Sequence, residues 1–146
     1  MDQSNRRVEF LRKDLADVRK ILDADGSLNE AEVARRSWHV CEIDDKSIFD
    51  EDARNLATAL RIENSGIFYV VRVCDLLSLT TSVAAYRFES TQDEIEAFQG
   101  PAWFEINLDD CLLFNLPFTC AVLRPGQVNV TKFLGDTAFV EEIEKI

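Results

Sequence analysis

The chain has 146 residues, 47% of them hydrophobic, and a formal net charge of −11. This length and apolar content fit one domain with a buried core, and no apolar run approaches the roughly 20 residues that a membrane-spanning helix requires. Such a negative charge argues against direct binding to nucleic acid or to an anionic membrane, because both need a cationic protein surface. The N-terminus shows no apolar stretch typical of a signal peptide, so we expect a cytoplasmic protein.

The N-terminal segment predicts two helices. Apolar residues recur every three or four positions from Val8 to Leu22, which is typical of a helix with one buried face. Ser27 and Glu30 then form an S-x-x-E capping box, which predicts a second, short helix to about Arg36. We therefore expect an N-terminal helical pair, with residues 1–6 loose ahead of it.

The corner between these helices, DADGSLNEAE at residues 23–32, resembles a calcium-binding EF-hand loop. If Gly26 takes the sixth position of such a loop, Asp25 and Glu32 fall on ligand positions. The first position, which ordinarily supplies an essential carboxylate, falls on Ile21. We therefore interpret the segment as a structural corner, in which Gly26 supplies a positive φ angle, and expect no metal site.

The middle of the chain predicts extended segments around one longer helix. Residues 37–43 indicate a short strand or connector, and the Ser47-x-x-Asp50 pattern begins a helix that residues 63–66 end. The runs at 67–74 and about 79–88 are rich in β-branched and aromatic residues. The first of them is apolar on both faces, which favours a central strand that is covered on each side.

The C-terminal half predicts further helix and strand. Thr91 and Glu94 cap a helix that QGP at 99–101 ends, and the following alternation from Ala102 to Leu108 favours a strand. A β-hairpin is predicted over 118–133, with Pro125 and Gly126 at its turn, and a last helix begins near Asp136. The order favours one α+β domain over residues 1–146, with a largely antiparallel sheet of about five strands packed with helices.

No known catalytic motif is present, so we expect neither an enzyme nor a cofactor. The four cysteines are widely spaced and form no C-x-x-C, which is typical of buried thiols in a reducing compartment. An enzymatic alternative would use His39 with Cys41, or a metal held by Asp109 and Asp110. A structural role accounts for these residues more simply: His39 has no catalytic role, and Asp109 with Asp110 forms a solvated turn.

The charge is unevenly distributed, and this directs attention to one surface. Residues 1–20 carry six basic and four acidic side chains, whereas residues 91–110 carry six acidic and no basic ones. By strand alternation Trp103 lies on the polar face, where an aromatic anchor ringed by carboxylates would suit a basic partner. The alternatives are that another helix covers Trp103, or that the charge serves solubility alone. The candidate partner-binding residues are Asp93, Glu94, Glu96, Trp103, Glu105, Asp109 and Asp110, with Trp38 as a weaker second anchor.

The leading hypothesis is a small, acidic, non-enzymatic protein-binding module, an inhibitor or immunity-type protein that neutralises a basic partner such as a toxin. Electrostatic steering would bring the partner to the 91–110 face, and an aromatic anchor would hold it there. The alternative within the binding class is a secretion-type chaperone, commonly a dimer, that holds a client protein on apolar grooves. The sequence does not indicate the oligomeric state.

Overall fold

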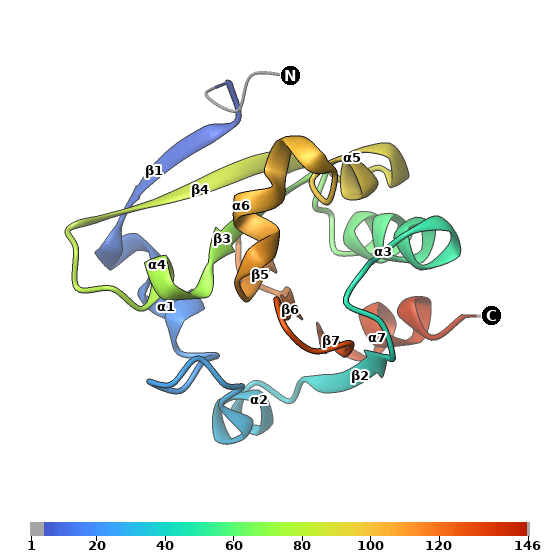
Figure 1. Cartoon of the computed structure of the whole chain (residues 1–146). Coiled ribbons are helices and arrows are strands. Elements are labelled where there is room, and N and C mark those ends of the chain that lie inside the picture. The colour runs from blue at the N-terminus through green and yellow to red at the C-terminus, as the bar shows by residue number, and fades with distance from the viewer. Residues whose placement is uncertain (1–4, 146) are drawn as a thin grey trace.

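The computed structural model describes residues 5–145. Within them one antiparallel sheet of seven strands has the order β1-β4-β3-β5-β6-β7-β2 (Figure 1). The strands are β1 (Arg7–Leu11), β2 (His39–Ile43), β3 (Ile67–Arg72), β4 (Ser82–Glu89), β5 (Cys111–Phe114), β6 (Cys120–Arg124) and β7 (Thr131–Gly135). The predicted α+β class is confirmed, but the expected number of about five strands was too low.

The helices are short except for α3. They are the 3-10 helix η2 (Arg12–Leu15), α1 (Ala16–Arg19), α2 (Glu30–Arg35), α3 (Asp50–Ile62), α4 (Val73–Leu76), α5 (Gln92–Ala97), the 3-10 helix η3 (Pro101–Trp103), α6 (Phe104–Leu108) and α7 (Thr137–Ile143). No helix within residues 5–145 is both long enough and apolar enough to cross a membrane. The predicted N-cap Thr91 is confirmed, because its side chain accepts from the Glu94 N–H at α5. Asp136, near which the last helix was expected to begin, is the N-cap of α7 and accepts from the Phe139 N–H.

Helices cover both faces of the sheet. On one face α3, α5, η3, α6 and α7 bury their apolar side chains against β3, β4, β5, β6 and β7. On the other face η2, α1, α2 and α4 pack on the same central strands through residues such as Leu15, Val18 and Val33. All four residues of β5 are therefore buried, and β3 is covered on both faces as its sequence predicts.

The predicted N-terminal helical pair is wrong in its first half. Residues Arg7–Leu11 form the edge strand β1, paired with β4 so that Val8 lies opposite Ala85. Helical structure begins only at Arg12, and Leu15 and Val18 then fill the apolar layer. The backbone hydrogen bonds of the β1–β4 ladder outweigh the local helical pattern, since propensity is a weak bias that tertiary pairing overrides. Residues 1–4, part of the segment expected to be loose, lie outside the described range.

The corner at 23–32 confirms one prediction and corrects another. Gly26 has φ +88°, the positive value expected of it. However, Ser27 does not cap α2: the Asn29 side chain accepts from the Glu32 N–H at 3.1 Å. Ser27 instead donates from its N–H and its hydroxyl to Asp25 Oδ1, at 3.0 and 2.6 Å. The corner is a hydrogen-bonded turn that leads into α2.

Candidate protein-binding surface

Trp103 is not a surface anchor, which corrects the prediction based on strand alternation. Residues Pro101–Leu108 form η3 and α6 rather than a strand, because Pro101 stands at the first helical position after Gly100. The Trp103 side chain is 1% exposed. It packs edge-on against Tyr86 and Phe88, with ring centroids 5.1 and 5.2 Å apart. Trp103 is therefore a core residue that fixes η3 and α6 on the sheet.

Two of the predicted carboxylates on α5 serve the fold. Glu94 forms a two-point ion pair with Arg6, at 2.6 and 2.8 Å, and this hydrogen bonding lowers the pKa of Glu94. Glu96 accepts a hydrogen bond from the Asp50 N–H at 2.7 Å, at the first residue of α3. Asp93 is exposed. Because Glu94 and Glu96 already bind other parts of the fold, α5 is a weaker candidate for a partner-binding surface than its acidic sequence suggests.

Helix α6 exposes a different pair of apolar side chains. Phe104 and Leu108 are 58% and 55% exposed, and their spacing of four residues places them one above the other on the same side of the helix. The acidic residues Glu105, Asp109 and Asp110 are exposed beside them. We call these five residues the α6 ridge. The structure thus places three of the predicted carboxylates beside Phe104 and Leu108. The predicted strand had put these two apolar residues on the face opposite Trp103.

Contacts with other elements hold the end of the α6 ridge in place. Asp109 accepts from Arg72 Nη2 at 2.8 Å, and Asp110 Oδ1 accepts from the Gly126 N–H at 2.9 Å. The loop after β6 packs so closely that a Cβ atom on Gly126 would lie 2.8 Å from Asp109 Cα. The ridge is therefore attached both to β3 and to the β6–β7 loop, which reduces the entropy lost when a partner binds it.

A hollow adjoins the C-terminal end of the ridge. Its lining includes Asp25, Gly26, Cys74, Leu77, Leu108 and Asp109. The 23–32 corner thus lies next to the α6 ridge, although the two are more than 70 residues apart in the sequence. The hollow combines apolar walls with carboxylates, the composition that suits a basic side chain with a long aliphatic stem.

The residues of the enzymatic alternatives have other surroundings. Cys41 is buried, and burial raises the pKa of its thiol to about 11, the opposite of the lowered value that activates a nucleophilic cysteine. His39 is exposed at the start of β2. Among residues 5–145 no group of three or more His, Cys, Asp or Glu side chains is placed to hold a metal ion. Trp38 is half-buried, with Arg36 stacked 5.1 Å from its ring.

Comparisons with protein-family models, with curated proteins and with solved structures found no match. The α6 ridge therefore rests on geometry alone. Sequence reasoning missed Phe104 and Leu108 because it assigned a period of two to residues 102–108. The spacing Trp103-x-x-Ile106, with Gly100-Pro101 before it, was the local signal for a helix.

Proposed function

We propose that the chain is a small, non-enzymatic module that binds and neutralises a basic partner protein, as inhibitor and immunity-type proteins do. The observation that carries this proposal is the α6 ridge, in which two exposed apolar side chains lie beside three carboxylates on a chain of net charge −11. Apolar anchors bordered by charge form the usual energetic centre of a protein interface. The proposal places the protein in the cytoplasm, where its four unpaired cysteines stay reduced.

Each part of the ridge has its own role in this proposal. The carboxylates and the overall negative charge speed the encounter with a basic surface, an effect that salt screens. Phe104 and Leu108 then lose their contact with water against the partner, which slows dissociation. A partner residue such as lysine or arginine would enter the hollow beside Leu108, with its charge near Asp109 and Asp25.

The experiment captures binding proteins on the immobilised full-length chain and measures association with the captured basic protein at about 50 and about 300 mM NaCl. Glu105→Lys should slow association, because it reverses one charge of the rim. The matched control is Glu51→Lys, which makes the same change at an exposed glutamate on α3. Equal association rates at the two salt concentrations would exclude the steering role.

The anchors are tested by truncation. Phe104→Ala and Leu108→Ala should each weaken binding by about 10- to 30-fold, through faster dissociation, if they are interface hot spots. Ile62→Ala serves as the control, because Ile62 is another exposed large apolar residue and lies at the end of α3. Equal losses in all three variants, or no loss in any, would refute the ridge as the binding surface.

A second candidate function, the secretion-type chaperone, is favoured by one observation. Among residues 5–145, strands β1 and β2 are the two edges of the sheet, and an edge strand is where an extended client strand can be added. This alternative predicts a dimer in light scattering and binding of an unfolded segment that depends little on salt. A monomer that binds only a folded basic protein would exclude it.

A further inference from the structure

A second hollow adjoins the one beside the α6 ridge. The first hollow, whose lining includes Leu108, has a volume of about 480 Å³. The second has a volume of about 280 Å³ and is lined by the 23–32 corner and by residues between the end of β6 and the start of β7. Asp25, Gly26 and Asp110 line both hollows, so the two hollows meet at these residues. We call the pair of hollows the corner groove.

The walls of the corner groove are largely apolar. Val73 and Leu77, at the start and just beyond the end of α4, line the first hollow. Val128 lines the second hollow and is 58% exposed. The second hollow also includes Lys132, whose Nζ lies 4.0 Å from Glu42 Oε2, so a carboxylate offsets its charge. Such walls gain burial when a partner fills the groove.

Two carboxylates lie where the hollows meet. Both Asp25 and Asp110 are exposed, and among residues 5–145 neither forms an ion pair. The neighbouring Asp109 differs, because Arg72 binds it at 2.8 Å. Hydrogen bonds from Ser27 lower the pKa of Asp25, so this carboxyl group stays ionised at neutral pH. The middle of the groove is therefore complementary to a positive charge.

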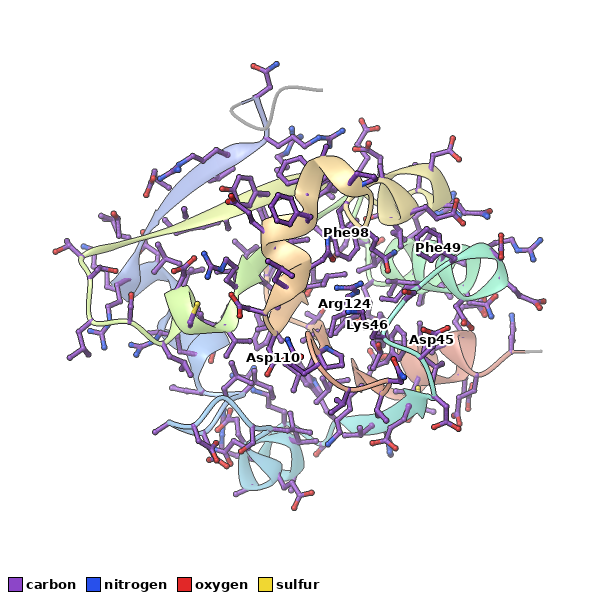
Figure 2. All side chains as sticks on the ribbon, viewed as in Figure 1. Asp45, Lys46, Phe49, Phe98, Asp110 and Arg124 are labelled. Carbon is purple, nitrogen blue, oxygen red and sulfur yellow. The ribbon has the colours of Figure 1, made fainter. Side chains whose placement is uncertain are left out.

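Backbone hydrogen bonds fix both sides of the corner groove. On the corner side, the Asp23 N–H donates to Ser27 O at 2.8 Å and closes the turn. On the opposite side, Asp110 Oδ1 accepts from the Gly126 N–H at 2.9 Å. Figure 2 shows Asp110 at the end of α6 that faces the corner. A groove that is already formed loses little conformational entropy when it is filled.

The shape of the groove favours a peptide chain over a compact small molecule. Small-molecule sites have volumes of roughly 300–1,000 Å³ and enclose most of the ligand. The second hollow is smaller than this range, and both hollows are open to solvent. An extended chain directs every second side chain to the same side, about 6–7 Å apart. Such a chain can place one side chain in each of two adjoining hollows.

We propose that the corner groove binds an extended segment of the basic partner, with a lysine or arginine in the first hollow and an apolar side chain, two residues away, in the second. The cationic group lies against Asp25 and Asp110, and its aliphatic stem packs on Leu77 and Leu108. The apolar side chain packs on Val128. This inference rests on the proposed function for the identity of the partner and adds which element of the partner is recognised.

The experiment uses Cys74 of the full chain as a reporter. Cys74 is exposed and lines the first hollow, whereas the other three cysteines are buried, so iodoacetamide modifies Cys74 first. The probe is the acetylated and amidated pentapeptide GRGLG, whose dissociation constant is measured by calorimetry. At ten times that constant, the peptide should slow the modification of Cys74 about tenfold. The matched peptides GEGLG and GRGSG, which reverse the charge or remove the apolar side chain, should protect Cys74 far less.

Matched variants place the peptide in both hollows. Asp25→Asn keeps the oxygen that accepts from Ser27 but removes the charge, and Val128→Asp puts a charge into the second hollow. Each should weaken the binding of GRGLG by about fivefold or more. The controls are Asp93→Asn and Leu79→Asp, which make the same kinds of change at exposed residues that line neither hollow and should bind as the wild type does.

The outcomes for the groove and for the α6 ridge are separable. Phe104 lines neither hollow, so Phe104→Ala should weaken the binding of the captured partner but leave the binding of GRGLG unchanged. The inference is overturned if GRGLG does not protect Cys74 at concentrations up to about 10 mM, or if GEGLG protects it equally. It is also overturned if Asp25→Asn and Val128→Asp bind the peptide as the wild type does. None of these results would affect the test of the ridge.

Discussion

Replacement of Trp103 by alanine tests whether this residue belongs to the core or to an interface. Trp103 is 1% exposed and contacts Tyr86 and Phe88. Truncation of a buried tryptophan lowers the free energy of unfolding by about 3–5 kcal/mol. At roughly 2.1 cal/mol/K of unfolding entropy per residue, this loss lowers the melting temperature by about 10–15 °C. Urea denaturation followed by circular dichroism measures the free energy directly.

The neighbouring residue supplies the control. Phe104→Ala removes another large aromatic side chain from the same helical segment, but an exposed one, and should change the free energy of unfolding by no more than about 0.5 kcal/mol. A stability loss below about 1 kcal/mol for Trp103→Ala would refute the reasoning, because no well-packed core tryptophan is so easily replaced. The same result would restore Trp103 as a surface anchor.

Three further predictions concern pH and close packing. Hydrogen bonds from Arg35 lower the pKa of Glu32 from 4.5 to about 2. The contribution of Glu32 to stability is therefore present above pH 4.5 and is lost as the pH falls toward 2. Glu32→Gln should reduce the change of melting temperature with pH in that interval. Burial raises the pKa of Glu63. Its contribution to the stability of the fold is therefore greatest below pH 4.5 and is lost as the pH rises through the raised pKa. The Glu63→Gln variant should have a higher melting temperature than the wild type at about pH 7 but not at about pH 4. Gly126→Ala should cost about 1–3 kcal/mol in urea denaturation, because its Cβ would lie 2.8 Å from Asp109 Cα, and an unchanged midpoint would contradict the close approach.

Local signals were sufficient where a few neighbouring residues decide the structure. Thr91 was identified as a helix cap from the Glu94 that follows it, and the last helix was expected to begin near Asp136. Both side chains accept a backbone N–H from the residue three positions later. The positive φ of Gly26 was predicted in the same way. In each case the interacting groups lie within three or four residues of one another, so the sequence window contains the whole interaction.

The errors arose where the deciding partner is distant in the sequence. The pattern from Val8 onward fits a helix, and only pairing with β4, more than 70 residues away, makes Arg7–Leu11 a strand. Residues 102–108 fit periods of both two and three to four, and the wrong choice exchanged the exposed and buried faces of Trp103 and Phe104.

The candidate surface was predicted only in part for a related reason. Composition reveals how many carboxylates residues 91–110 contain, but not which of them the fold itself uses. Glu94 binds Arg6 and Glu96 binds the backbone of α3, in both cases across more than 40 residues.

The central claim, that the α6 ridge binds a basic protein, is tested most directly by hydrogen exchange of the protein with and without its captured partner. We predict that backbone amides of residues 104–110, and those of the adjoining corner around Gly26, exchange more slowly in the complex. The amides of the edge strands β1 and β2 should be unaffected. Protection confined to an edge strand, with none over 104–110, would contradict the account.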